Sequence, residues 1–163
     1  MTGAVRPTLG NERMAINRDF NNQPTQDTIG GKTYKFRSTL ERNWAAYLQF
    51  LKESDLIYDW RYEQTRFEFH DETIGAKVWL VDFDILNTDW TLEYHETKGW
   101  LQGKDVTKFA RVAKYRPEVK ITLIMSGKAK KDANRLRQID KYAERIIFAP
   151  DIFRKIKGVV NLI

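Results

Sequence analysis

Hydrophobic and polar residues alternate most regularly in residues 78–100. Two runs rich in β-branched and aromatic residues flank the polar segment N-T-D-W, and this arrangement predicts a β-hairpin. Because side chains along a strand point alternately to opposite faces, Asp82 and Asp84 share one face. Glu96 and Lys98 likewise share a face of the second strand, roughly 6.6 Å apart. Pairing of the two strands would bring Asp82, Glu96 and Lys98 together.

Apolar residues recur at helical spacing in three further segments. Residues 38–52 follow this period and begin with the capping-box sequence S-x-x-E formed by Ser38 and Glu41. Residues 104–115 combine one apolar face with an opposite face that is almost entirely cationic. Residues 128–145 contain seven basic and three acidic residues around an apolar stripe. We expect a helix in each segment.

Shorter patterns complete the predicted domain. Aromatic and charged residues alternate in residues 58–69, which predicts a strand, and residues 121–125 form an apolar run typical of a buried strand. Residues 146–148 predict a last short strand and residues 151–157 a last helical turn. The expected fold class is α/β, with a mixed central β-sheet and the first two helices on its opposite sides.

The beginning of the chain differs from the rest. Residues 1–33 lack sustained periodicity and are rich in Gly, Asn, Thr and Gln, which predicts a flexible N-terminal arm. Two readings of the arm stay open, a disordered tail and a segment that orders on DNA or on a second subunit. Residues 34–163 are then a single domain, long enough to bury one hydrophobic core.

Composition narrows the function. The 163 residues include 28 Lys and Arg against 22 Asp and Glu, and this net charge of +6 suits a polyanionic partner such as DNA. The absence of cysteine excludes disulfides and thiolate metal sites. No apolar run approaches the roughly 20 residues of a membrane span, and the N-terminus lacks the apolar core of a signal peptide. We therefore expect a cytoplasmic protein with no membrane partner.

Asp82, Glu96 and Lys98 are the first candidate catalytic residues. Carboxylates and an ammonium group on an apolar sheet are costly to bury without partners, and a divalent cation with a phosphate would satisfy all three. Mg²⁺ binds carboxylate oxygens and keeps several waters, and we expect Mn²⁺ to substitute for it. A lysine beside the metal can stabilise charge on a phosphoryl group. The alternative is a solvated strand on which opposite charges alternate.

Three other polar residues have two readings each. The Glu41 carboxylate can reach back to the backbone of its own helix cap, or it can face the sheet as a third carboxylate of the site. Glu63 is read as a solvated strand residue rather than a peripheral site residue. His95 is read as a buried, hydrogen-bonded histidine rather than a proton-transfer group.

Two basic segments, residues 104–115 and 128–145, are candidate contacts for DNA phosphates, because Lys and Arg neutralise the backbone. An ordinary amphipathic surface helix would show the same pattern. The candidate DNA-binding residues are Lys104, Lys108, Arg111, Lys114, Lys130, Lys131 and Arg135.

The order D-(x13)-E-x-K resembles the PD-(D/E)XK nuclease superfamily, with Val81 in place of the family's proline. Over roughly residues 34–150 the chain resembles phage endonuclease I, the Holliday junction resolvase family of T-seven-like phages. This resemblance rests on F-R-S-x-x-E ending at Glu41, on V-D-F around Asp82, and on E-T-K-G beginning at Glu96.

The resemblance implies a restriction-endonuclease-like core and a metal-dependent endodeoxyribonuclease, a hydrolase of phosphodiester bonds. It implies a catalytic set of Glu41, Asp82, Glu96 and Lys98, with the carboxylates and the backbone carbonyl of Thr97 on Mg²⁺. It further implies a homodimer that cuts branched DNA in the cytoplasm of a phage-infected host. End-cleaving or nicking nucleases of phages and transposons share these motifs and stay an alternative, as does a non-catalytic DNA-binding accessory protein.

Overall fold

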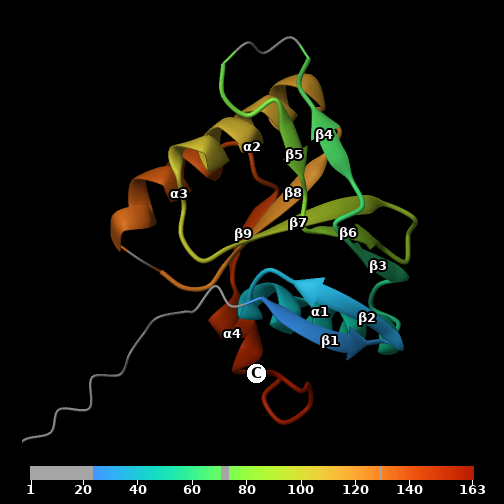
Figure 1. Ribbon diagram of the computed structural model, residues 1–163. Coiled ribbons are helices and arrows are strands. Elements are labelled where there is room, and N and C mark those ends of the chain that lie inside the picture. The colour runs from blue at the N-terminus through green and yellow to red at the C-terminus, as the bar shows by residue number, and fades with distance from the viewer. Residues whose placement is uncertain (1–23, 71–73, 129) are drawn as a thin grey trace, which may run out of the picture.

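A mixed five-stranded sheet forms the centre of the computed structural model, which describes residues 24–70, 74–128 and 130–163 (Figure 1). In sheet order the strands are β3 (Asp59–Tyr62), β6 (Phe83–Leu86), β7 (Leu92–Lys98), β8 (Lys120–Met125) and β9 (Arg145–Phe148). Neighbouring strands are antiparallel from β3 through β6 to β7, and parallel from β7 through β8 to β9.

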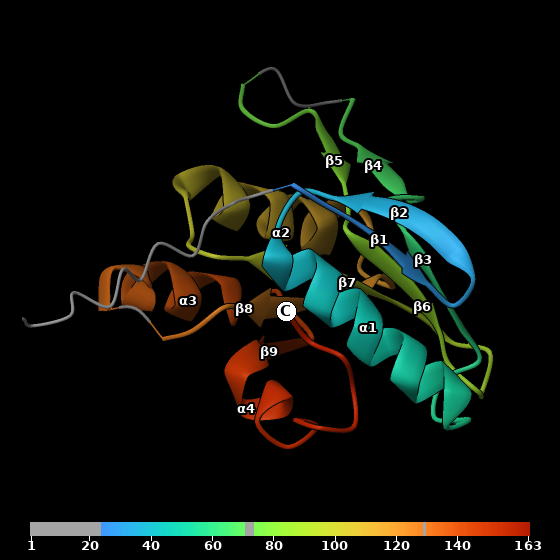
Figure 2. The ribbon, with the colours of Figure 1, turned by 60° about the horizontal axis from the view of Figure 1, so that its bottom comes forward.

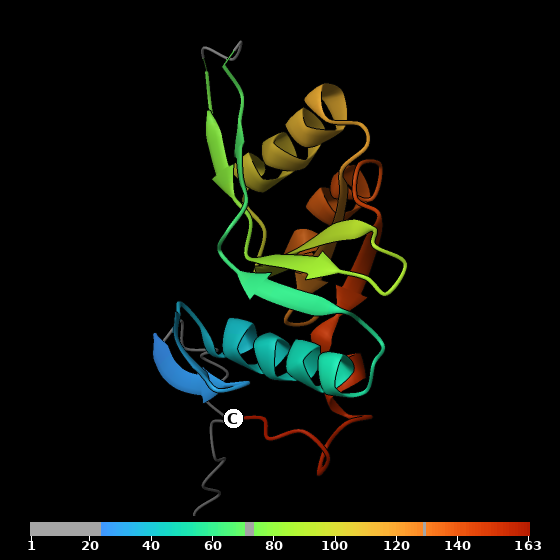
Figure 3. The same ribbon diagram turned by 90° about the vertical axis from the view of Figure 1, so that its right-hand side faces the viewer.

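Helices cover both faces of this sheet (Figure 3). The long helix α1 (Thr39–Glu53) lies on one face, as does the short α4 (Ala149–Phe153). On the other face lie α2 (Gly103–Tyr115) and α3 (Ala133–Ile139), which the 3₁₀ turn η1 (Lys130–Asp132) precedes. The predicted α/β class, with a mixed sheet between the first two helices, is confirmed.

Each face of the sheet has its own hydrophobic core. Trp44 of α1 packs in one core with Ile124 of β8, and Phe109 of α2 packs in the other with Leu123 and Met125. Alternate residues of β8 therefore supply opposite cores, and all but the first residue of the strand is buried. Burial on both faces explains why residues 121–125 read as an uninterrupted apolar run.

A second ribbon lies beside α1 and corrects the predicted arm (Figure 2). β1 (Thr25–Ile29) pairs antiparallel with β2 (Lys32–Phe36) through a Gly30–Gly31 turn, where φ is +59° and +80°. Ile29 is buried in the α1-side core, so the turn-rich composition here reflects a hairpin. Of the residues predicted as an arm, 1–23 lie outside the described residues and 25–29 and 32–33 are strand.

The predicted strands 58–69 and 78–86 are each divided in two. β4 (Arg66–Glu68) and β5 (Val78–Leu80) pair with each other and leave the central sheet (Figure 1). The break falls at Glu63, whose φ is +50°, and opposite it the Glu63 N–H donates to the carbonyl of Asp82. Alternation continues through such a bend, so the pattern could not reveal it. The hairpin of β6 with β7 is confirmed.

The predicted helix 128–145 is too long. Of the described residues in this range, only those of α3 and the preceding η1 are helical. The chain turns after Ile139, and the Glu144 N–H donates to the carbonyl of Ile121, which starts the pairing of β9. The strand 146–148 is confirmed within β9, whereas the last helix begins at Ala149, earlier than predicted. Within the described residues, no helix combines the length and apolar character that crossing a membrane requires.

Candidate active site

Three buried carboxylates and one lysine gather where β6 begins, β7 ends and α1 starts. Glu41, Asp82 and Glu96 are 7%, 2% and 2% exposed, respectively. Asp82 precedes β6 at the bend, Glu96 and Lys98 lie in the last residues of β7, and Glu41 lies in the first turn of α1. The structure therefore brings together all four residues of the predicted catalytic set.

Two residues, Thr97 and Arg37, donate hydrogen bonds to the Asp82 carboxylate. Its Oδ2 accepts hydrogen bonds from the backbone N–H and the hydroxyl of Thr97, both at 2.7 Å. Its Oδ1 accepts a hydrogen bond from Arg37 Nη2 at 2.8 Å. Thr97 thus orients the carboxylate through its N–H and side chain, a role that its predicted use as a carbonyl ligand did not include.

Glu96 and Lys98 form the most buried ion pair of the site. Lys98 Nζ lies 2.6 Å from Glu96 Oε1, as the shared strand face predicted. The other oxygen, Glu96 Oε2, is buried without a hydrogen-bond partner. Burial and the negative charge of Asp82 raise the pKa of Glu96 to about 7, although Lys98 acts in the opposite direction.

Lys98 remains cationic in this environment. Burial alone would lower its pKa, but the negative charges of Glu96 and Asp82 outweigh that effect, and the pKa of Lys98 is raised. An unprotonated lysine could accept a proton from water, whereas this one can act only as a fixed positive charge or a hydrogen-bond donor.

Glu41 serves both the helix cap and the site. Its N–H donates to the Ser38 hydroxyl at 3.2 Å, which confirms the predicted N-cap. Its Oε2 accepts from the N–H of Arg37 at 2.9 Å, one residue before the cap, and from the Tyr62 hydroxyl at 2.5 Å. Burial and the nearby charge of Asp82 raise the pKa of Glu41. The two readings of Glu41 are therefore not exclusive.

Arg37 joins the carboxylates from the outside. Its Nη2 lies 2.8 Å from Asp82 Oδ1 and 2.6 Å from Glu63 Oε1, and its Nε lies 3.9 Å from Glu41 Oε2. The prediction that Glu63 is a solvated strand residue is therefore wrong, because Glu63 pairs with Arg37 at the rim of the site.

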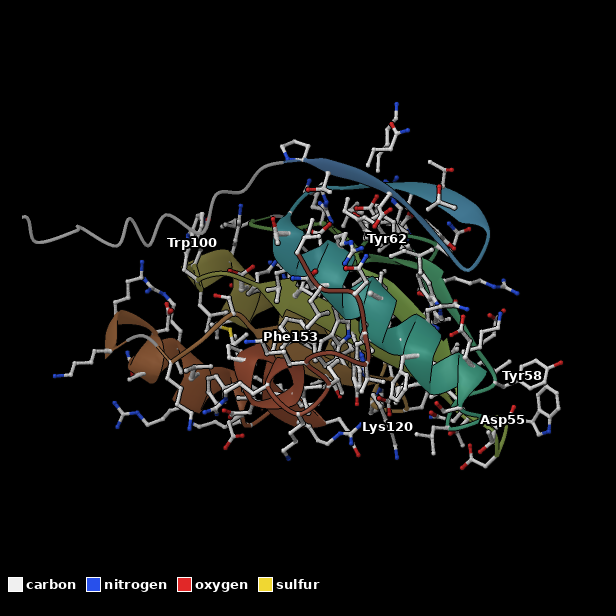
Figure 4. The ribbon with its side chains drawn as sticks, turned by 90° about the horizontal axis from the view of Figure 1, so that it is seen from below. Asp55, Tyr58, Tyr62, Trp100, Lys120 and Phe153 are labelled. Atoms are coloured by element: carbon white, nitrogen blue, oxygen red, sulfur yellow. The ribbon has the colours of Figure 1, made fainter. Side chains whose placement is uncertain are left out.

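Figure 4 shows how strand β3 runs along α1. Tyr62 lies nearer the N-terminal end of the helix, and Tyr58 lies by the C-terminal end of the helix.

The α2 side of the site contributes Asp105 and Lys108. Asp105 is 3% exposed, caps α2 by accepting from the N–H of Gln102 at 2.7 Å, and lies 3.9 Å from Lys98 Nζ. Lys108 is partly buried, with Nζ 5.6 Å from the centre of the Trp79 ring. Burial lowers the pKa of Lys108, and the charge of Glu96 acts against this lowering. Lys108 is thus part of the site wall rather than an outlying surface cation.

The donor set suits a hard cation. The described residues contain no group of three or more His, Cys, Asp or Glu arranged to hold a metal ion. Mg²⁺ often uses only one or two protein carboxylates and keeps waters for its other positions. The unpartnered Oε2 of Glu96, near the charge of Asp82, is the kind of oxygen that such an ion would satisfy.

The predicted DNA-binding residues other than Lys108, which lies in the site wall, are spread over α2, α3 and the segment between them. A groove between α2 and α3 is lined by four of them, Arg111, Lys114, Lys131 and Arg135. Lys104 and Lys130 are exposed at the ends of their segments. Arg111 does not fit the prediction of a surface phosphate contact, because it is 8% exposed and donates to the backbone carbonyls of Ile74 and Ala76.

His95 buttresses the site strand from the opposite face of the sheet. The Trp44 indole N–H donates to His95 Nδ1 at 3.0 Å, so the ring proton is on Nε2 and is shared with Glu93 at 2.6 Å. Glu93 also pairs with Arg145 at 2.9 Å. Burial lowers the pKa of His95. The prediction of a buried, hydrogen-bonded histidine is confirmed.

Sequence reasoning missed three site residues: Arg37, Tyr62 and Asp105. Arg37 stands inside the F-R-S-x-x-E motif, so the motif itself carried a signal. Tyr62 follows Tyr58 and Trp60 in a series of alternate aromatic residues, and nothing distinguishes it there. Asp105 reads as an acidic residue of a first helical turn, which has an ordinary explanation in the helix dipole.

Comparison with known proteins adds no relative. No protein-family model matches the chain, and neither the curated proteins nor the solved structures gave a match. The function therefore has to be argued from the geometry of the site.

Glu96 should make stability pH-dependent when divalent cations are absent. Because its pKa in the folded chain lies above the ordinary 4.5, folding retains a proton that the unfolded chain releases between pH 4.5 and about 7. The free energy of unfolding should fall as pH rises through this window, by up to about 3 kcal/mol. Glu96→Gln should lack this part of the fall, which urea denaturation at several pH values would measure.

Glu144→Gln is the matched control, because Glu144 is exposed and pairs with Lys120 at 3.8 Å, remote in sequence from the site. This variant should follow the wild-type pH dependence. Identical pH dependence of Glu96→Gln and the wild type would contradict a raised pKa at Glu96.

Proposed function

We propose that the protein is a metal-dependent DNA endonuclease that hydrolyses phosphodiester bonds with Mg²⁺ or Mn²⁺. One observation carries the proposal: the buried Glu96 has one oxygen on Lys98 at 2.6 Å and the other oxygen unpartnered, next to the charge of Asp82. A buried carboxylate pair is unfavourable unless a cation compensates it. We also propose that the sheet with α1 on one face is a restriction-endonuclease-like core.

Asp82 and Glu96 would hold the metal, with Glu41 as a third carboxylate and the carbonyl of Thr97 as a further ligand. When bound, the ion would neutralise charge on the phosphate and lower the pKa of a coordinated water. Thr97 keeps Asp82 oriented through two hydrogen bonds at 2.7 Å. Tyr62 does the same for Glu41. Such fixed donors leave little reorganisation for the moment of reaction.

Lys98 is the residue we assign to the transition state. Its raised pKa keeps it protonated, so its role is electrostatic, placed where negative charge grows on the phosphoryl oxygens. Lys108 supplies a second positive charge on the wall of the same site. Together they favour a phosphate over a neutral substrate.

The groove between α2 and α3 supports DNA as the partner. Lys114, Lys131 and Arg135 line it, and α2 also carries Lys108 and Asp105 of the site wall. A duplex whose cleaved phosphate lies at Lys98 would need such cations along its backbone. No element of the described residues suggests base reading, so we propose selection by DNA shape.

A DNA-binding accessory protein without catalysis is the second candidate, and the basic groove favours it equally. It does not account for carboxylates buried beside the same surface, because they would repel phosphate in the absence of a cation. An end-cleaving or nicking nuclease would use the same site and differ only in substrate.

Asp82→Asn and Glu96→Gln should each lower DNA cleavage at least about a hundredfold, because each removes a charge that a divalent cation needs. Binding of DNA without divalent ions should persist or tighten, since a repulsive charge is removed. Cleavage of labelled duplex and gel-shift titration would measure the two effects. Asp84→Asn is the control, because Asp84 lies two residues on and accepts from the Thr65 hydroxyl at 2.7 Å. Wild-type cleavage by Glu96→Gln would refute the site.

Neutralising the groove should change the salt dependence of DNA binding. Replacing Lys114, Lys131 and Arg135 by Gln should flatten the slope of log K against log salt by up to about 2.7, close to 0.9 for each phosphate that the variant no longer neutralises. The matched control replaces three exposed cations outside the groove, Lys120, Lys155 and Lys157. Equal slopes for the two triple variants would mean that the groove contributes no more to DNA binding than any other charged surface of the protein.

Branched DNA should be preferred over linear duplex at equal salt, and the protein should be a homodimer. Two symmetric cuts in a four-way junction need two sites related by a two-fold axis. Light scattering over a concentration series would test the dimer, and competition between a junction and a matched duplex would test the preference. A monomer that cuts both equally would favour the nicking or end-cleaving alternative.

A further inference from the structure

We propose that Arg37 is an exchangeable counter-ion, which occupies the cation position at Asp82 until a divalent metal displaces it and which then binds a DNA phosphate. This inference rests on the proposed function. It concerns a residue outside the predicted catalytic set, and it predicts that one side chain has opposite effects on metal affinity and DNA affinity.

The hydrogen bonds of Asp82 identify the contested oxygen. Its Oδ2 already accepts two hydrogen bonds from Thr97, one of them from a backbone N–H that cannot move away without disturbing β7. Its Oδ1 is the oxygen left for a cation, and Arg37 Nη2 occupies it at 2.8 Å. A metal ion that binds Asp82 through Oδ1 therefore has to replace the guanidinium group.

The exchange of Arg37 for a metal ion would leave the carboxylates around Arg37 with a compensating positive charge. The guanidinium group lies near three carboxylates, those of Asp82, Glu63 and Glu41, at 2.8, 2.6 and 3.9 Å. Without a metal, this cation and Lys98 both form ion pairs with the buried acidic groups. A divalent ion would take over that compensation, and the guanidinium would no longer be needed at Asp82.

Arg37 is also placed to leave. Its side chain is 59% exposed, whereas that of Asp82 is 3% exposed, so the guanidinium approaches from the solvent side. Glu63, on the rim at 27% exposure, holds the same nitrogen at 2.6 Å and could retain the side chain beside the site. Arg is well suited to a phosphate because its planar fork offers two parallel donors.

The test compares Arg37→Gln with Arg66→Gln. Arg66 is the matched control, because its side chain is also 59% exposed and pairs at 3.2 Å with Glu68, a carboxylate that is not part of the site. Calorimetric titration with Mn²⁺ in the absence of DNA should show roughly tenfold tighter binding by Arg37→Gln than by the wild type, since a competing ion pair is gone. Arg66→Gln should bind Mn²⁺ as the wild type does.

DNA binding and thermal unfolding provide independent readouts. In Ca²⁺, Arg37→Gln should bind duplex several-fold more weakly, because one cation that binds a phosphate is removed. Without divalent ions, Arg37→Gln should unfold at a lower temperature than the wild type. Mn²⁺ should raise the unfolding temperature of Arg37→Gln by more than it raises that of the wild type. Arg37→Lys keeps the positive charge but lacks the planar guanidinium, and its metal affinity should lie between those of the wild type and Arg37→Gln. This variant keeps the test possible if Arg37→Gln folds poorly.

The outcomes separate this inference from the proposed function. Metal affinity of Arg37→Gln equal to or below that of the wild type overturns the exchange, as does an unchanged DNA affinity. Absence of Mn²⁺ binding by every variant overturns both proposals. Tighter Mn²⁺ binding and weaker DNA binding by Arg37→Gln, in a protein that does not cleave DNA, supports the exchange and overturns the nuclease.

Discussion

Burial of three carboxylates in one place is the constraint on which the rest of the structure depends. Glu41, Asp82 and Glu96 come from α1, the bend before β6, and β7, so no single element could be moved without exposing or isolating one of them. Each unpaired buried charge would cost several kcal/mol. The surrounding donors, which are Thr97, Tyr62, Arg37 and Lys98, reduce that cost without removing it, as the raised pKa of Glu96 shows.

The bend at Glu63 places Asp82 among those donors. A positive φ at a residue other than glycine costs on the order of 1 kcal/mol or more, and such strain persists only where surrounding contacts enforce it. Here the N–H of Glu63 donates to the carbonyl of Asp82, and Glu63 itself binds Arg37. The same bend carries β4 and β5 away from the central sheet, toward the α2 face. The bend at Glu63 thus determines both the position of Asp82 and the path of β4 and β5.

His95 supports β7 from the face opposite to Glu96 and Lys98. On the α1 face of the sheet, Trp44, His95 and Glu93 form a chain of hydrogen bonds that holds β7 in place. Near Lys98, α2 contributes Asp105 and Lys108. A polar chain with every member satisfied is rigid, and rigidity behind β7 keeps Glu96 and Lys98 in fixed register with β8.

The sequence by itself determined the fold class, both long helices and the convergence of Asp82, Glu96 and Lys98, because periodicity reports which side chains face a core and which share a strand face. It also placed the Ser38 cap, since capping depends on residues three apart. Tertiary structure alone decided the division of the long hairpin at Glu63, the inward role of Arg111 and the contact of Arg37 with Asp82. The partners lie far away in the chain, 35 and 37 residues for Arg111 and 45 residues for Arg37. A local pattern carries no information about which distant group a charged side chain will meet.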